Sequence, residues 1–150
     1  MHVGSNPTDN ANMLVQRRTL RCPNGYRFYV KLYNNTRTSS VESRSLPRES
    51  TTSIRVDLKK DHDVVGYVDL VWTRFGFWET HSFLDEEERG KNLGTIMYAK
   101  AIDVILRRNQ RVKSSKSPSN YAKRVWTSRR LNQAYVISYR GGRFCVISKR

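Results

Sequence analysis

The chain has 150 residues, of which 37% are hydrophobic and 11% aromatic, and its formal net charge is +15. This length fits one domain with a real core, and the recurring apolar runs argue against wholesale disorder. No apolar run approaches the roughly 20 residues that span a bilayer, and the first residues lack the apolar stretch of a secretory signal, so the sequence predicts a soluble cytoplasmic protein without membrane contacts.

The N-terminal third contains one predicted strand between two polar segments. Residues 1–13 are rich in Asn, Ser, Asp, Gly and Pro and are predicted to form a flexible tail, so that a single domain spans residues 14–150. Residues 26–33 mix aromatic and β-branched residues with charged ones, as half-buried strands do. Residues 34–53 are almost wholly polar and predict a long surface loop.

Three strands are predicted next, joined as a meander. Residues 53–58 alternate apolar and polar side chains, and residues 64–72 form the second strand of the same hairpin after a turn at 59–63. Residues 77–84 supply the third strand, after a further turn at 73–76.

The segment from Arg89 to Thr95 joins the third strand to an amphipathic helix. Its glycines, Gly90 and Gly94, predict a tight turn that leaves backbone N–H groups free. Asn92 can cap the helix that follows. Because a helix N-terminus binds phosphate without needing many side chains, we predict an anion site here, which we call the cradle.

The helix after the cradle is predicted from apolar residues spaced three and four apart. These are Leu93, Ile96, Met97, Ala101, Val104 and Ile105. A short strand at 111–115 would return parallel to the strand at 77–84 and complete a β-α-β unit.

A second helix and a hairpin are predicted to close the chain. Ser117 and Pro118 have the pattern of a helix start, with Ser at the cap and Pro at the first helical position. The buried side of this helix would consist of Ala122, Val125, Trp126 and Leu131. Two glycines at 141–142, between alternating segments, predict a β-hairpin over 134–148.

In this order of elements, and in the cradle, the chain resembles the GCN5-related N-acetyltransferase (GNAT) family over residues 53–148. The family signature is Gln or Arg, two residues, Gly, one residue, and Gly or Ala. Its places are occupied here by Arg89, Gly90, Lys91, Asn92, Leu93 and Gly94. Asn92 stands where the first signature glycine is expected, and Asn tolerates left-handed backbone angles.

The resemblance implies an α+β fold with a mixed, mostly antiparallel sheet, flanking helices and a C-terminal β-hairpin. It also implies transfer of acetyl from acetyl-CoA to an amine of a protein lysine, an N-terminus or a small molecule. In the family, backbone amides of the cradle hold the pyrophosphate, and the end of the preceding strand binds the pantetheine and thioester. The cofactor-binding residues that it implies are Leu84, Arg89, Gly90, Lys91, Asn92, Leu93, Gly94, Thr95 and Ser119.

The catalytic residues are expected on the strand before the cradle and on the second helix. Glu79 and His81 point to one sheet face by their spacing of two, in the region from which relatives often draw a base. On the second helix, Ser119 aligns with a family Asn and Trp126 with the Tyr that protonates the departing thiolate. Because indole cannot act as an acid, nearby Tyr121 is the candidate. Alternatively, another group or water protonates the thiolate, no reaction takes place, or Glu79 and His81 are ordinary strand-surface residues.

A second hypothesis is a catalytically degenerate protein of this fold that binds nucleic acid or an acidic protein. Residues 100–150 hold 14 Lys and Arg against the single acid Asp103. The positive electrostatic field of these residues attracts polyanions, although scattered, solvated Lys and Arg side chains explain the charge excess equally well. The basic and aromatic residues that interleave in this region are Lys113, Lys116, Lys123, Arg124, Arg129, Arg130, Tyr121 and Trp126.

Other patterns exclude some chemistries. Cys22 and Cys145 lie far apart, which fits a reducing compartment, and the histidines have no metal-ligand spacing, so we predict no metal site. P-loop, dinucleotide-binding and Gly-x-Ser-x-Gly motifs are missing, and nucleotide hydrolysis and serine hydrolysis therefore have no support. The acidic run 85–88 is interpreted as a solvated segment before the helix, with recruitment of a cationic substrate as the alternative.

Overall fold

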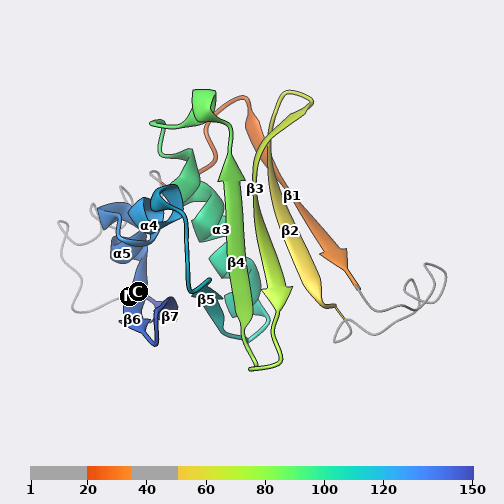
Figure 1. The fold of residues 1–150 in the computed structure, drawn as a ribbon. Coiled ribbons are helices and arrows are strands. Elements are labelled where there is room, and N and C mark those ends of the chain that lie inside the picture. The colour runs from red at the N-terminus through yellow and green to blue at the C-terminus, as the bar shows by residue number, and fades with distance from the viewer. Residues whose placement is uncertain (1–19, 35–50) are drawn as a thin grey trace, which may run out of the picture.

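A computed structural model describes residues 20–34 and 51–150 of the chain (Figure 1). Within these described residues, seven strands form one sheet in the order β1-β2-β3-β4-β5-β7-β6. The predicted tail at 1–13 and most of the predicted loop at 34–53 lie outside the described residues. The predicted α+β fold with a mixed, mostly antiparallel sheet is confirmed.

The first four strands pair antiparallel. They are β1 (Tyr26–Tyr33), β2 (Ser53–Lys60), β3 (Asp63–Trp72) and β4 (Trp78–Leu84). The strand predicted at 26–33 and the meander before the cradle are therefore confirmed. The turn predicted at 59–63 is wrong in extent, because pairing continues to Lys60 and Asp63 and Asp61, with a left-handed φ of 56°, lies in the short turn between them.

The remaining elements follow β4 in chain order. They are the 3-10 helix η2 (Glu86–Glu88), α3 (Leu93–Arg107), β5 (Val112–Ser114), α4 (Asn120–Trp126), α5 (Arg129–Ala134), β6 (Tyr135–Arg140) and β7 (Arg143–Lys149). β5 pairs parallel with β4, which confirms the predicted β-α-β unit. β6 and β7 form the predicted hairpin around Gly141 and Gly142, which both have positive φ.

The second helix differs from the prediction at both ends. It begins after Ser119, whose hydroxyl accepts a hydrogen bond from the backbone N–H of Ala122 at 3.1 Å, and not at Ser117. Leu131 belongs to the separate helix α5, because Ser128 caps a new helix there. Two capping serines therefore set these boundaries, against the proline signal.

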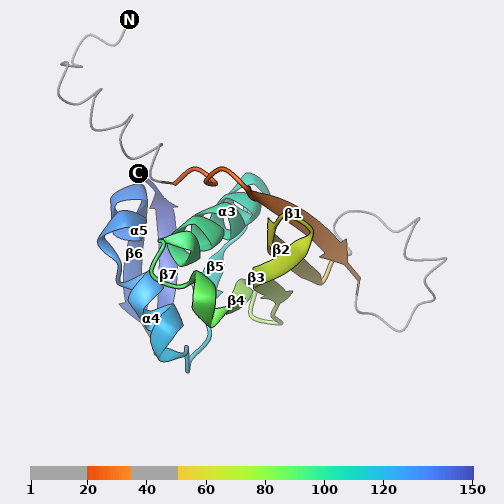
Figure 2. The same cartoon turned by 90° about the horizontal axis from the view of Figure 1, so that it is seen from above.

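The core lies between α3 and one face of the sheet (Figure 1). Seen from above, α3 lies between β1 and β2 on one side and β6 and β7 on the other (Figure 2). The fully buried side chains of this core include Ile54, Val56, Leu58, Val68, Leu70, Met97, Ile102 and Ile105. Val104, predicted on the packing face of α3, is only half-buried. No helix in the described part of the chain has the length and apolarity needed to cross a bilayer.

Candidate functional site

The cradle is a turn with two left-handed residues between η2 and α3. Gly90 has a φ of 85° and Asn92 a φ of 62°. Asn92 is the N-cap of α3, as predicted, but its side chain makes no capping hydrogen bond. Left-handed angles are natural for Gly and tolerated by Asn, and this explains how Asn92 can occupy the place of a glycine.

The backbone N–H groups of the cradle are available to a ligand. Within residues 20–34 and 51–150, no hydrogen bond uses the backbone N–H of any residue from Gly90 to Thr95. The partial positive charge at the N-terminus of α3, a helix of 15 residues, adds to these donors. The cradle can therefore bind an anion such as a phosphate group.

Two basic side chains of the cradle contact neighbouring protein groups. Arg89 donates from Nε to the backbone oxygen of Leu84 at 3.1 Å, and its guanidinium lies 4.8 Å from the centroid of the Tyr121 ring. Lys91 Nζ lies 3.0 Å from Glu88 Oε2. Arg89 thus ties the end of β4 to α4, while the charge of Lys91 is paired.

Glu88 anchors the cradle to β1 and β2. Its carboxylate accepts hydrogen bonds from Tyr26 Oη at 2.5 Å, Lys91 Nζ at 3.0 Å and Lys60 Nζ at 3.2 Å. These bonds, with that from Tyr26 the strongest, outweigh the effect of burial and lower the pKa of Glu88 to about 2. The interpretation of the run 85–88 as solvated is therefore wrong at Glu88, which is 6% exposed.

A cavity of about 270 Å³ opens at the cradle, between the N-terminus of α3 and α4. It is lined by Gly90, Asn92, Leu93, Gly94, Thr95, Tyr121, Arg124, Val125 and Ser128. Tyr121 lies directly against Gly94, since a Cβ atom at Gly94 would be 1.9 Å from the tyrosine hydroxyl oxygen. Gly94 therefore lets α4 approach the cradle closely.

A second cavity, which we call the slot, lies where β4 and β5 separate. β5 pairs with β4 only as far as Thr80 and Ser114, so residues 81–84 of β4 have no strand neighbour on that side. The slot has a volume of about 160 Å³ and is lined by Thr80, His81, Ser82, Tyr98, Ser115, Ser117, Pro118, Ser119, Ala122 and Trp126. α4 thus contributes to both the cradle cavity and the slot.

The slot contains buried polar groups without partners. Tyr98 Oη and Ser82 Oγ lie 2.7 Å apart. Thr80 Oγ1 and Trp126 Nε1 are buried and make no hydrogen bond of good geometry within the described residues, although both lie close enough to the Tyr98 hydroxyl to oppose the effect of burial, which raises the pKa of that tyrosine. Because a poorly paired buried polar atom costs free energy, these two atoms favour a polar ligand in the slot.

Neither a protein-family model nor a curated protein matches the sequence. The fold, however, matches that of a protein from Klebsiella pneumoniae assigned as an acyl-CoA N-acyltransferase. The match covers 82% of this chain and 98% of the other, with a TM-score of 0.52 and 14% identity. The chain has the GNAT fold.

Two further solved structures with the GNAT fold are similar at lower TM-scores. A protein from Bacillus anthracis assigned as a streptothricin acetyltransferase, in complex with acetyl coenzyme A, is 13% identical over 81% of this chain and 80% of its own, with a TM-score of 0.47. The ribosomal-protein-S5-alanine acetyltransferase of Vibrio fischeri is 18% identical over 63% of this chain and 60% of its own, with a TM-score of 0.46.

Glu79 and His81 lie together on β4 of this GNAT fold. Glu79 Oε1 is 2.8 Å from His81 Nε2, and Arg143 Nη1 donates to Glu79 Oε2. Partial burial opposes ionisation of Glu79, but the hydrogen bonds from Arg143 and His81 outweigh it and lower the pKa of Glu79. Because a carboxylate only accepts hydrogen bonds, His81 Nε2 carries the proton, and Nδ1 is the basic atom of the neutral ring.

The residues predicted on the second helix belong to different cavities. Ser119 caps α4 and lines the slot, whereas Tyr121 lines the cradle cavity. Burial raises the pKa of Tyr121. Trp126, which aligns with the family Tyr, lines the slot.

Several residues in and around the slot were not predicted from the sequence. Tyr98 and Thr80 resemble ordinary core residues in the apolar pattern of α3 and β4, although a hydroxyl at a buried helix position is itself a signal. Arg143 gives no local signal, because its contact with Glu79 joins residues 64 apart in the chain.

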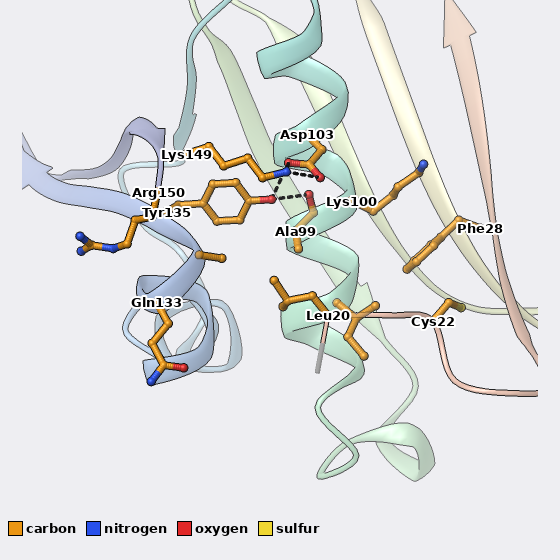
Figure 3. A pocket seen from close by; sticks show the side chains of 12 residues that line it. Leu20, Cys22, Phe28, Ala99, Lys100, Asp103, Gln133, Tyr135, Lys149 and Arg150 are labelled. Atoms are coloured by element: carbon orange, nitrogen blue, oxygen red, sulfur yellow. Dashed lines mark hydrogen bonds and ion pairs between the residues drawn. The ribbon is translucent and has the colours of Figure 1, made fainter. Parts of the chain in front are cut away.

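A larger cavity, of about 480 Å³, shares no lining residue with the slot or the cradle cavity (Figure 3). The hydroxyl of Tyr135 lies 2.6 Å from Asp103 Oδ1 and 3.1 Å from the backbone oxygen of Ala99, and Lys149 also contacts Asp103. These polar groups satisfy one another, unlike those of the slot. No three His, Cys, Asp or Glu residues of the described segments form a metal site. The candidate site therefore consists of the cradle and the slot.

Proposed function

We propose that the chain binds acetyl-CoA and transfers its acetyl group to an amine of a protein or small molecule. The observation that carries this proposal is the position of the slot beside the cradle, with unpaired polar groups in both. The GNAT fold supports it independently.

The cradle would bind the diphosphate of the coenzyme. Backbone N–H groups from Gly90 to Thr95 supply the donors. Arg124 is exposed and lines the cradle cavity, so its guanidinium can form a charge-assisted hydrogen bond with a phosphate oxygen. Tyr121 would support the cradle by packing against Gly94.

The slot would bind the thioester arm beside the acceptor amine. Thr80 Oγ1 and Trp126 Nε1 offer polar contacts there, and Ser119 lies at the same cavity. A thioester is already activated, so holding it next to the amine supplies much of the rate enhancement.

His81 would remove the proton from the amine, with Glu79 as a positioning residue. His81 lines the slot, and its side chain is 51% exposed. The lowered pKa of Glu79 makes its carboxylate a weak base but keeps it charged as an acceptor for His81 Nε2.

Calorimetric titration with acetyl-CoA tests the binding step. Arg124→Glu places a negative charge in the cradle cavity and should weaken binding about tenfold or more. Lys123→Glu is the matched control, because it makes the same charge change on the adjacent exposed residue of α4, which lines neither cavity. Equal weakening by both variants, or no binding by the unmodified chain, would contradict the proposal.

Mass spectrometry of candidate amines after incubation with acetyl-CoA tests the transfer step. His81→Gln keeps a polar side chain of similar size and should lower the rate about 100-fold while acetyl-CoA still binds. An unchanged rate would exclude His81 as the base. Bound coenzyme without any acetylated amine would exclude the transfer itself.

The burial of Trp126 weakens the alternative hypothesis that the chain binds nucleic acid. Trp126 is 1% exposed and cannot stack on a base. A mobility shift with nucleic acid that disappears between about 50 and about 200 mM salt, in a chain that binds no acetyl-CoA, would favour the alternative.

A further inference from the structure

Negative charge develops on the thioester as an amine attacks it, first on the carbonyl oxygen and then on the departing sulfur, and the protein has to stabilise this charge. The inference below rests on the proposed function, because this charge develops only if the chain transfers an acetyl group. The residues that line the slot in the described part of the chain include neither Lys nor Arg. Apart from His81, which the proposed function uses as the base, the side-chain donors of the slot are neutral hydroxyl and indole groups.

Trp126 presents a fixed donor to the slot. Its Nε1 atom is buried and makes no hydrogen bond of good geometry among the described residues, and it lies close enough to the Tyr98 hydroxyl to oppose the effect of burial, which raises the pKa of that tyrosine. The indole is held on two sides. The Tyr98 ring meets it edge-on, with 5.3 Å between ring centroids, and the Phe144 ring stacks on it, with 5.9 Å between ring centroids and an interplanar angle of 5°. A donor held in this way needs no reorganisation when charge develops beside it.

Tyr98 presents a second donor to the same cavity. Its hydroxyl lies 2.7 Å from Ser82 Oγ, and either oxygen can be the donor of that bond. When Ser82 donates, the phenolic proton of Tyr98 is free to point into the slot. Burial raises the pKa of Tyr98 to about 12, so this group stays a neutral O–H donor over the working range of pH.

We propose that the Tyr98 hydroxyl and the Trp126 indole N–H stabilise the charge on the thioester as neutral hydrogen-bond donors, and that no side chain protonates the departing sulfur. The amine nitrogen forms its bond to the carbonyl carbon, the carbon–sulfur bond breaks, and the electron pair leaves with sulfur. His81 takes the amine proton. The sulfur leaves as a thiolate and takes a proton from solvent after release.

Proton affinities support donation without proton transfer. An ordinary thiol has a pKa of about 8.5, so a thiolate cannot readily take a proton from a phenol that holds it as tightly as Tyr98 does. Trp126 has no acidity to offer in this range. Both groups therefore bind the charge and keep their protons.

The indole resonances of a chain labelled with ¹⁵N at tryptophan test the contact without any turnover. Trp126→Phe assigns the Trp126 signal, and Trp78 is an internal control because its Nε1 already donates to Gln110 Oε1 at 2.9 Å. Saturation with acetyl-CoA should shift the Trp126 N–H signal and leave that of Trp78 in place. An unmoved Trp126 signal in a chain that binds acetyl-CoA would overturn the inference.

Steady-state kinetics test the role of Tyr98. Tyr98→Phe should lower kcat about 100-fold with KM for acetyl-CoA changed less than about threefold, because the bond strengthens only as charge develops. Tyr135→Phe is the matched control, since it removes another buried tyrosine hydroxyl, in the larger cavity, and should leave kcat unchanged. An unchanged kcat in Tyr98→Phe would overturn the inference while leaving the proposed function standing.

The pH profile tests whether a side chain other than Tyr98 protonates the departing sulfur. Because the pKa of Tyr98 is about 12, its hydroxyl keeps its proton between about pH 8 and about pH 10, and kcat should not fall over that interval. A fall there that persists in Tyr98→Phe would identify another acid and overturn the inference. Failure of the unmodified chain to bind acetyl-CoA would overturn the proposed function and this inference together.

Discussion

Gly94 has room for only a hydrogen atom on the side that faces α4. A Cβ atom there would lie 1.9 Å from the Tyr121 hydroxyl oxygen and 3.0 Å from Val125 Cγ2. We therefore expect Gly94→Ala to lower the free energy of unfolding by about 1 to 3 kcal/mol through overpacking. Chemical denaturation measures the change.

The part of the Gly94→Ala cost that comes from the contact with Tyr121 can be measured separately from the cost of alanine at this helix position. In a Tyr121→Leu background the ring is gone, and Gly94→Ala should then cost less than half as much as in the unmodified chain, as a double-mutant cycle would measure. An equal cost in both backgrounds would mean that Tyr121 does not determine the requirement for glycine.

Glu88 makes the stability of the fold depend on pH. Its folded-state pKa of about 2 lies below the ordinary value of 4.5, so the folded chain favours the ionised carboxylate. The stabilisation is complete above about pH 4.5 and is lost as the pH falls towards 2. Glu88→Gln should therefore lower the midpoint of thermal unfolding at pH 7, and the difference from the unmodified chain should shrink as the pH falls below 4.5.

The neighbouring acid provides the control for Glu88. Glu87 is exposed, and Glu87→Gln should leave the midpoint of unfolding nearly unchanged at every pH. A difference between Glu88→Gln and the unmodified chain that stays constant down to about pH 2 would mean that packing of the side chain, and not its charge, stabilises the cradle.

At the scale of residues, local chemistry was predictable and long-range chemistry was not. Asn92 could be placed at the start of α3 because a left-handed backbone angle depends on a few adjacent residues. The roles of Tyr98, Thr80 and Arg143 depend on which elements meet in space, and no spacing along the chain encodes that.

At the scale of elements, Ser119 decides where α4 begins. Its hydroxyl accepts from the backbone N–H of Ala122 at 3.1 Å, whereas Ser117 lies outside the helix. Ser119→Ala should lower the free energy of unfolding by about 1 kcal/mol, the usual cost of a lost cap, and Ser117→Ala should cost much less. Chemical denaturation of the two variants compares them directly, and the reverse order of costs would favour the start predicted from Pro118.

Strand and hairpin predictions succeeded where the alternation of side chains was unbroken. β1 and the β6–β7 hairpin follow the predicted ranges closely. The helical region after β5 was harder, because Pro118 suggests a helix start and two serines nearby can also cap one. Packing decides between these possible helix starts, because Ala122 and Val125 of α4 are both buried.

At the scale of the whole molecule, the short length of β5 creates the slot. Only three residues of β5 pair with β4, and the sheet continues through β7 and β6 beyond it. The sequence predicted a parallel return strand at 111–115, but the separation of the strands after Ser114 arises from tertiary packing. The cradle was predictable because it is local, whereas the slot required the assembled sheet.

Amide resonances of a uniformly ¹⁵N-labelled chain titrated with coenzyme A test the central claim most directly. If the cradle binds the diphosphate through its backbone, the largest shifts should fall on the N–H groups from Gly90 to Thr95, with further shifts at Ser82 and Trp126 of the slot. Shifts confined to the larger cavity around Ala99 and Tyr135, or no shifts at saturating coenzyme A, would contradict the account.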